Sequence, residues 1–559
     1  MIPPIFVHDY LRRSALLHPD KTALVFEKER ITYAELDRRS SRLARELVGC
    51  GVVRQDRIVI FLDNSPEIIV SLFGILKADA IFIVVNGGIR ANKLAFILND
   101  AGAAMLISHT GKQQVVLDAM GIVDRDIPII WLGDIGEIPS SLSARSLPWD
   151  SIFFSTAAAD SNLVLNRSKN LDLDLTALIY TSGTTGEPKG VMVSHFNMIS
   201  AARSIIQHLD NTGNDIILDV LPLSFNYGLY QVIMAVMFGG TVVIEKSFTF
   251  IHKVLQRIAE ENITGFPIVP TILAMILKLD DVHRYNLDSL RYITNTGAKL
   301  PVSHIRRFRF MFPRVKIYSM FGLTECKRVC GMPPDELDAR PESVGKPMPN
   351  CEVFLVDDAG NEVGPGQIGE LVVRGANVMK GYWNAPELTA RVFRPGRYPG
   401  DTFLYSGDYF RRDADGYLYF VGRRDDIIKS KGERLNTKEI EDTLCDMEEI
   451  AEAAVIGVPD EIYGLAVKAF VVCRNGSKTG VRDILRHCRK YLEPYAIPKQ
   501  IEILENLPKT DHGKTDKKAL KQLEMVSLKK STETPATDSA PRYISTVVPI
   551  STAQGPRDG

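Results

Sequence analysis

The sequence lacks a charge excess and lacks an uninterrupted apolar run long enough to cross a membrane. Its 67 Lys and Arg residues balance 68 Asp and Glu residues, for a formal net charge of −1, so no basic face for nucleic acid is expected. The N-terminal stretch MIPPIFVHDYLRRS has no long apolar core of the kind found in signal peptides. The most apolar segment, residues 68–85, carries Lys77 and Asp79 at its middle, which favours a buried helix followed by a strand. We therefore expect a cytoplasmic protein that is not integral to a membrane.

Cysteine is scarce and dispersed. The seven cysteines stand at positions 50, 326, 330, 351, 445, 473 and 488. Only Cys326 and Cys330 are close in the sequence, and no second pair is present to complete a zinc site. An odd, dispersed set is typical of reduced thiols in the cytosol.

The length and the hydrophobic periodicity predict the fold class. A chain of 559 residues is too long for one core and indicates two or more domains. Amphipathic helical stretches alternate with short β-rich runs, as in residues 31–52 then 57–63, 93–103 then 104–109, and 252–263 then 264–270. Alternation of this kind predicts an α/β fold whose mostly parallel sheets are covered by helices.

The composition changes twice along the chain and suggests domain boundaries. Near residue 350, segments rich in Gly and Asp predict a β-rich subdomain within the large domain. From about residue 423 the pattern is that of a compact α+β unit, and the last thirty or so residues are rich in Ser, Thr and Pro. We predict a large domain over residues 1–421, a small mobile domain over 422–525 and a disordered tail over 526–559.

The stretch TSGTTGEPKG, residues 181–190, has the composition of a loop that holds phosphate. It is not the common phosphate-binding loop, because counting on from Gly183 that pattern requires Gly where the chain has Pro188. Gly183 and Gly186 let the backbone curl so that successive N–H groups point at an anion. Further donors come from Thr181, Ser182, Thr184, Thr185 and Lys189. Taken alone, the stretch is either a phosphate-binding loop or a polar turn between a strand and a helix.

Five further motifs follow in a characteristic order. They are TNTGAKLP (294–301), YSMFGLTE (318–325), YSGD (405–408), GRRDDIIKSKGERLNTKEIE (422–441) and LPKTDHGK (507–514). Together with the first stretch, this set resembles the adenylate-forming superfamily of acyl-CoA synthetases, peptide-synthetase adenylation domains and luciferases, over roughly residues 10–525. Within this superfamily, the motifs most resemble those of the acyl-CoA or acyl-AMP ligases. The resemblance implies an AMP-forming acid–thiol ligase that uses ATP and Mg²⁺.

The resemblance implies how the reacting charges are handled. A carboxylate attacks the α-phosphate of ATP and expels pyrophosphate, so the site has to neutralise several negative charges and hold the reactants in line. The 181–190 loop would wrap the β- and γ-phosphates. Glu325 would hold Mg²⁺, a hard cation that prefers oxygen ligands, and Thr324 would bond the α-phosphate or the acyl carboxylate.

The nucleotide is expected to lie against the next motifs. The family usually stacks adenine on a Tyr at the position of Phe321, which keeps the stacking face without the hydroxyl. The backbone of Gly297 and Ala298 would cover the other side of adenine. Asp408 and Arg423 would contact the ribose, and Gly322 belongs to the same nucleotide-binding set.

Residues near the C-terminus are implied to serve the two half-reactions. Lys514 would enter the site and bridge the α-phosphate and the carboxylate as the catalytic lysine. Asp425 would be the hinge about which the small domain turns before thiol transfer. Gly432 would then line the path of the pantetheine, and Lys431 would meet phosphates of CoA or remain a solvated surface charge.

The segment LPLSFNYGLYQ, residues 221–231, bears on the acid. Acyl-CoA ligases often carry a histidine where this chain has Phe225, and amino-acid-activating domains carry an Asp where it has Asn226. A buried ammonium without a carboxylate partner is costly, so an amino acid is disfavoured. We expect Phe225, Asn226 and Tyr227 to border a substrate pocket for a hydrophobic acid, of fatty-acid type.

Several alternatives stay open at this point. The thiol is either CoA or the phosphopantetheine of an acyl carrier protein, which is the one protein partner expected. The chain could also be a stand-alone amino-acid-activating enzyme, a luciferase-type oxygenase or a non-catalytic acyl-adenylate-binding protein. The last is disfavoured by Lys514 and Glu325, because a pure binding protein has no need of them.

Overall fold

The computed structural model describes residues 3–134, 146–154, 170–182, 188–297, 299–423, 427–430, 433–460, 464–474, 476–477, 479–492, 496–509 and 515–524. It forms two compact units, one of Met1–Ser406 with Arg412–Tyr419 and the other of Gly407–Arg411 with Phe420–Gly559. The boundaries expected from the sequence stay a prediction, and the expected tail, 526–559, lies outside the described residues. The predicted fold class is confirmed: α/β, with a large N-terminal part of mostly parallel sheets, a β-rich subdomain and a small C-terminal part.

A nine-stranded sheet forms one half of the large unit. Its strand order is β16-β15-β14-β13-β12-β10-β11-β1-β2. The strands from β14 to β1 in this order run parallel, and the outer pairings are antiparallel. The bounds are β1 (Thr22–Phe26), β2 (Glu29–Thr32), β10 (Ile216–Asp219), β11 (Thr241–Ile244), β12 (Gly265–Ile268), β13 (Tyr292–Asn295), β14 (Lys316–Phe321), β15 (Cys330–Gly331) and β16 (Lys346–Pro347).

A seven-stranded sheet forms the other half of the large unit. Its order is β7-β6-β5-β3-β4-β8-β9, parallel except for the antiparallel pair β8 and β9. The bounds are β3 (Arg57–Phe61), β4 (Ile81–Val84), β5 (Met105–His109), β6 (Ile129–Leu132), β7 (Ser146–Pro148), β8 (Leu175–Ser182) and β9 (Pro188–Ser194).

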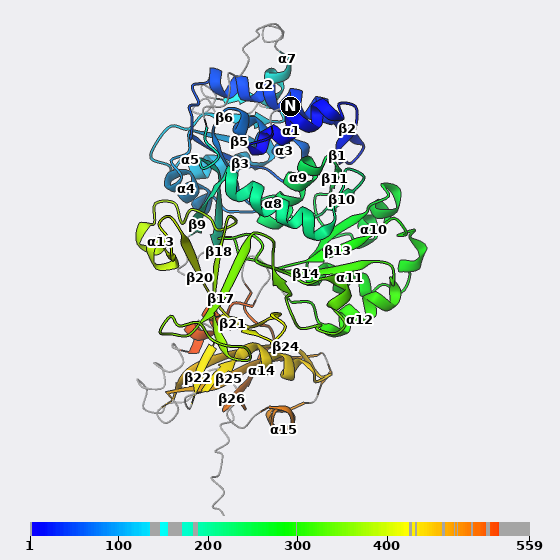
Figure 1. The fold of residues 1–559 in the computed structure, drawn as a ribbon, viewed down its shortest axis with the longest axis vertical. Helices are drawn as coiled ribbons and strands as arrows, with labels where there is room; N and C mark the ends of the chain where they lie inside the picture. Colours follow the sequence, from blue (N-terminus) through cyan, green and yellow to red (C-terminus); the bar gives the residue numbers. More distant parts are fainter. Residues whose placement is uncertain are drawn as a thin grey trace, which may run out of the picture. The chain divides into compact units, whose positions relative to one another are not determined.

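Helices cover these sheets and connect their strands. In the large unit they are α1 (Val7–Leu17), α2 (Tyr33–Gly49), α3 (Pro66–Lys77), α4 (Ala91–Asp100), α5 (Gln113–Met120), α7 (Trp149–Phe154), α8 (His195–Leu209), α9 (Asn226–Phe238), α10 (Ile251–Glu260), α11 (Pro270–Leu277), α12 (Val302–Met311) and α13 (Pro386–Val392), with short 3-10 turns η1 (Thr110–Lys112), η3 (Val282–Arg284) and η4 (Pro334–Glu336). Helix α9 contacts both α8 and α1 (Figure 1).

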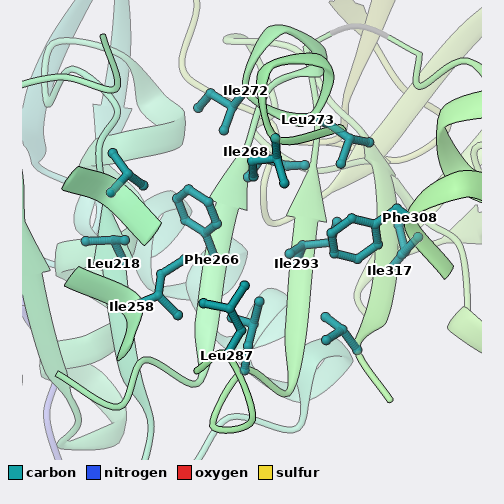
Figure 2. Close-up of a cluster of buried hydrophobic side chains, with 14 of the residues drawn as sticks. Leu218, Ile258, Phe266, Ile268, Ile272, Leu273, Leu287, Ile293, Phe308 and Ile317 are labelled. Atoms are coloured by element: carbon teal, nitrogen blue, oxygen red, sulfur yellow. The ribbon is translucent and has the colours of Figure 1, made fainter. Parts of the chain in front are cut away.

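The core of the nine-stranded sheet lies between its strands and the helices α10, α11 and α12. Figure 2 shows Phe266 and Ile293, from the neighbouring strands β12 and β13, among Leu273 of α11 and Phe308 of α12. Because this face of the sheet is filled by aliphatic and aromatic side chains, the strand ends are held rigidly. The residues that follow the carboxyl ends of the parallel strands therefore start from fixed positions at the edge of the sheet.

The remaining strands form two smaller sheets. One has the order β17-β18-β20-β19 with β21 beside β20, and the other the order β23-β22-β25-β24 with β26 beside β25. The bounds are β17 (Cys351–Val356), β18 (Ile368–Gly375), β19 (Phe393–Pro395), β20 (Thr402–Arg412), β21 (Leu418–Arg423), β22 (Ile427–Ser430), β23 (Glu433–Asn436), β24 (Ile450–Asp460), β25 (Gly464–Cys473) and β26 (Gln500–Ile503). Helices α14 (Thr437–Cys445) and α15 (Val481–Tyr491) pack on the second of these sheets.

Candidate active site

The 181–190 stretch connects two antiparallel strands of the seven-stranded sheet. Thr181 lies opposite Lys189 in the register of β8 and β9, and Ser182 lies opposite Pro188. The stretch is therefore not a turn between a strand and a helix. The loop residues Gly183, Thr184, Thr185 and Gly186 lie outside the described residues. Their contact with phosphate stays a prediction.

A second segment of the chain is bonded along β9. Trp383 N donates to Gly190 O at 2.8 Å, and Met192 exchanges two backbone hydrogen bonds with this segment, each of 2.9 Å. These are Met192 N to Gly381 O and Lys380 N to Met192 O. Residues 380–383 are thus fixed beside the base of the predicted phosphate loop.

The same segment holds Glu325. The Tyr382 hydroxyl donates to Glu325 Oε1 at 2.7 Å, and Met379 N donates to the Glu325 carbonyl at 2.9 Å. Burial, together with the negative charge of Glu325, raises the pKa of Tyr382, so its hydroxyl stays protonated and keeps donating. One carboxylate oxygen of the predicted Mg²⁺ ligand is thereby fixed in direction. Tyr382 was not found from the sequence, because it lies 57 residues from Glu325 and forms no local pattern with it.

The turn that carries Thr324 and Glu325 can be made only with glycine at its start. A Cβ on Gly322 would lie 1.7 Å from the Lys327 carbonyl oxygen, which no side chain permits. Val329 N donates to Phe321 O at 2.9 Å and closes the turn behind it, while Lys327 adopts a left-handed backbone with φ 57°. The compact turn projects Thr324 and Glu325 from the end of β14.

The two predicted adenine contacts lie at one edge of the nine-stranded sheet. Phe321 is the last residue of β14, and Gly297 follows the end of the parallel neighbour β13. Gly297 has φ +86° and is exposed, and no atom lies within 4 Å of a Cβ built on it. Among the described residues, nothing covers its backbone; Ala298 lies outside them. Adenine binding here stays a prediction.

The two predicted ribose residues contact one another. Arg423 Nε of β21 lies 3.3 Å from Asp408 Oδ1 of β20, and the Asp408 side chain is almost fully buried. A paired guanidinium fixes the carboxylate and leaves it able to accept further hydrogen bonds. Asp425, Lys431, Gly432 and Lys514 lie outside the described residues, so the hinge, thiol-path and catalytic roles stay predictions.

The predicted acyl segment forms the start of α9. Phe225 is the N-cap residue and is 38% exposed, and Asn226 is the first residue of the helix. The Tyr227 hydroxyl bonds both the carbonyl oxygen and the hydroxyl of Thr294 at 2.7 Å, which ties α9 to the end of β13. A Cβ on Gly228 would lie 2.7 Å from the Pro222 carbonyl oxygen, so the helix begins tightly against the preceding turn.

Two cations missed by the sequence analysis are buried beside this segment. Lys327 and Arg328 are only 3% and 4% exposed. Lys327 Nζ lies 4.1 Å from the ring centroid of Tyr230, and the Arg328 guanidinium carbon lies 4.9 Å from that of Tyr227. Burial lowers the pKa of Lys327 well below its ordinary value and that of Arg328 to about 10. The only sequence signal was two adjacent cations directly after Thr-Glu-Cys.

The donors present suit a magnesium ion held mainly by substrate. Within the described ranges, no group of three or more His, Cys, Asp or Glu side chains could hold a metal ion. Mg²⁺ bound with nucleotide commonly takes one or two protein carboxylates, phosphate oxygens and water. A single oriented carboxylate such as Glu325 fits that pattern.

No helix in the described part of the chain has the length and hydropathy needed to span a bilayer.

Comparison with known proteins identifies relatives over nearly the whole chain. Residues 11–383 match the family model described as AMP-binding enzyme, and residues 439–514 match the AMP-binding enzyme C-terminal domain. A long-chain-fatty-acid–CoA ligase of Bacillus subtilis (strain 168) is 30% identical over 532 residues, covering 92% of this chain and 93% of that protein.

Solved structures show the same fold. An anthranilate CoA ligase in complex with anthranoyl-AMP has a TM-score of 0.81 at 27% identity, covering 94% of this chain and 99% of that one. The o-succinylbenzoate coenzyme A synthetase of Bacillus subtilis, in complex with ATP and a magnesium ion, has a TM-score of 0.77 at 27% identity, covering 92% and 99%.

Proposed function

Because the chain belongs to the family of AMP-binding enzymes, we propose that it activates a hydrophobic carboxylic acid, of fatty-acid type, to acyl-AMP and transfers the acyl group to a thiol. Pyrophosphate leaves in the first step. The thiol is CoA or the phosphopantetheine of an acyl carrier protein. At the level that the comparisons support, the chain is an AMP-forming acyl-CoA ligase-like enzyme. A cytoplasmic location belongs to the same proposal.

The observation that carries the proposal is the anchoring of Glu325. Its carboxylate is fixed by Tyr382, from the segment bonded along β9, at the base of the predicted phosphate loop. Two elements remote in sequence thus meet where the triphosphate would need a metal-bound carboxylate. A carboxylate oriented in advance needs little reorganisation when charge develops, which is the main source of rate in such sites.

The chain's own residues divide the work of adenylation. Bound Mg²⁺ would neutralise phosphate oxygens and polarise the α-phosphate. Glu325 would hold this ion and Tyr382 would orient Glu325. Thr324 would position the α-phosphate or the incoming carboxylate, and Lys514 would balance the charge that develops between them.

The fatty-acid assignment is supported by the relatives and by α9. The matched Bacillus protein is named a long-chain-fatty-acid–CoA ligase, and α9 is mostly apolar, with all of Gly228–Val236 buried. Asn226 stands where an amino-acid-activating domain has its Asp, and a buried ammonium without a carboxylate partner is costly. An amino acid is therefore the second candidate, disfavoured by that position.

The test is ATP–pyrophosphate exchange over a panel of fatty, aryl and amino acids, followed by thioester formation with CoA and with a pantetheinylated carrier protein. We expect exchange with fatty acids and loss of exchange in Glu325→Gln, which keeps the size of the side chain but removes its charge. Exchange with amino acids alone would refute the acid class, and no exchange with any acid would refute the activity.

A further inference from the structure

A group of buried polar atoms lies beside the acyl segment. They belong to Asp219, Asn226, Tyr230, Lys327 and Arg328, which we call the polar cluster. Asp219 ends β10, Asn226 begins α9, and the two cations follow the end of β14. In parallel α/β sheets, ligands bind outside this carboxyl edge. The polar cluster is therefore part of the edge where a ligand is expected, next to residues 225–227.

The members of the polar cluster contact one another through the cations. Lys327 Nζ donates to the backbone oxygen of Asn226 and lies over the ring of Tyr230. Tyr230 is fully buried, whereas Phe225, five residues earlier, is 38% exposed. Through the bond to Asn226, the polar cluster contacts the first residue of α9, directly after Phe225 in the chain.

The charges in the polar cluster are poorly balanced. Asp219 is fully buried, its Oδ1 accepts from Leu221 N at 3.1 Å, and burial raises its pKa well above the ordinary value. Burial likewise lowers the pKa of Lys327 well below its ordinary value, so both groups favour their neutral forms and Arg328 carries the positive charge of the polar cluster.

Among the residues that the structure describes, several atoms of the polar cluster have no hydrogen-bond partner. These atoms are both side-chain amide atoms of Asn226, the Tyr230 hydroxyl, Arg328 Nε and Asp219 Oδ2. Buried polar groups in native proteins are almost always bonded, because an unmade bond costs the full desolvation of the group. A purely aliphatic acyl chain would satisfy none of them.

We propose that the acid activated by this enzyme carries, besides the carboxylate that is adenylated, an oxygen acceptor on its acyl chain that hydrogen-bonds Arg328 and Asn226. The acceptor is a carboxylate, carbonyl or hydroxyl oxygen on an otherwise apolar chain. The inference rests on the proposed function and narrows its substrate class from a plain fatty acid to an oxygenated one.

The test compares acids of equal chain length. Unsubstituted fatty acids and their oxo, hydroxy and dicarboxylic counterparts are assayed by ATP–pyrophosphate exchange with the natural protein, Arg328→Met and Tyr230→Phe. We expect the natural protein to favour an oxygenated acid by at least about tenfold in kcat/KM, because a site built to bond an oxygen rejects the analogue that lacks it. Arg328→Met should lose most of that preference.

A matched control is Lys77→Met. Lys77 is another buried lysine, but it ends α3 and is bonded to Asp37 Oδ1 of α2 at 2.7 Å. Its loss should lower thermal stability without changing the ratio of kcat/KM between oxygenated and unsubstituted acids. Tyr230→Phe removes a hydroxyl that has no hydrogen-bond partner among the described residues. The melting temperature of this variant without acid should therefore not fall, while its preference for the oxygenated acid should weaken.

Three results would overturn the inference. The first is a natural protein that uses unsubstituted acids best. The second is an equal loss for all acids in Arg328→Met, which would mean that the cation meets the adenylated carboxylate itself. The third is a marked drop in the melting temperature of Tyr230→Phe, which would give its hydroxyl a structural partner. If no acid supports exchange, the proposed function fails. Calorimetric titration of the same acids, with AMP present, into the natural protein and Arg328→Met then decides whether the oxygenated acid binds more tightly.

Discussion

Acid should weaken the docking of α1 on α8, the helix that follows the hairpin of β8 and β9. His8 of α1 and His195, the first residue of α8, are both buried, with ring centroids 5.9 Å apart. Val7 N donates to His195 Nδ1 at 3.2 Å, whereas His8 Nδ1 and His195 Nε2 have no hydrogen-bond partner in the described part of the chain. Burial lowers the pKa of each imidazole from 6.5 to about 3.

The sign and size follow from proton linkage. A depressed folded pKa means that the unfolded chain binds more protons below pH 6.5, so stability falls as the pH falls from about 6.5 towards 3. At pH 5 the folded rings remain neutral and the exposed rings are almost fully protonated. The loss is then about 2 kcal/mol for each histidine and about 4 kcal/mol for both, set by the ordinary pKa of the exposed ring.

The assay is amide hydrogen exchange of α1, measured by mass spectrometry at pH 7 and pH 5 and corrected for intrinsic rates. A loss of about 4 kcal/mol corresponds to a fall of roughly a thousandfold in protection. His8→Phe keeps a ring against Phe6, which lies 5.5 Å away. Because only His195 then titrates, the loss at pH 5 should be about 2 kcal/mol instead of about 4 kcal/mol. Equal protection at both pH values in the natural protein, or an unchanged pH effect in His8→Phe, would refute the reasoning.

Three further predictions concern the site. Tyr382→Phe should raise the Mg²⁺ concentration needed for half-maximal exchange and slow exchange about tenfold, because Glu325 loses its orienting donor; a titration with Mg²⁺ at saturating ATP that shows no shift would contradict this role. Lys514→Ala should slow acyl-adenylate formation by at least about 100-fold and affect thioester formation from supplied acyl-AMP far less, and equal losses in both steps would remove Lys514 from the first. Gly322→Ala should lower the melting temperature and abolish exchange, since its Cβ would lie 1.7 Å from the Lys327 carbonyl oxygen; near-normal thermal unfolding would show that the turn can open.

Several helices and strands of the large unit could be predicted from local patterns. The amphipathic stretch 31–52 is α2, which Thr32 caps by accepting from Glu35 N, and residues 57–63 contain β3. The apolar segment 68–85 is the buried α3 followed by β4. These predictions succeed because burial of one face requires a periodic spacing that the sequence shows directly.

The buried cations could not be predicted in the same way. Lys327 and Arg328 are adjacent charges, a pattern that normally marks a solvated surface. They are buried because the turn made possible by Gly322 folds back against α9, which begins about 100 residues earlier. The burial of Asp219 could not be predicted either, since nothing in the adjacent sequence distinguishes a strand-end carboxylate in solvent from a buried one.

By itself, the sequence determined the alternation of helices and strands and the family, and it predicted the residue types that adenylation would need. Only the tertiary structure decided that Tyr382 orients Glu325, that the hairpin of β8 and β9 lies beside this pair, and that Lys327 faces Tyr230. The physical reason is that periodicity and motif spacing record local constraints. The direction of a side chain and the loss of its water are set by whichever remote segments pack against it.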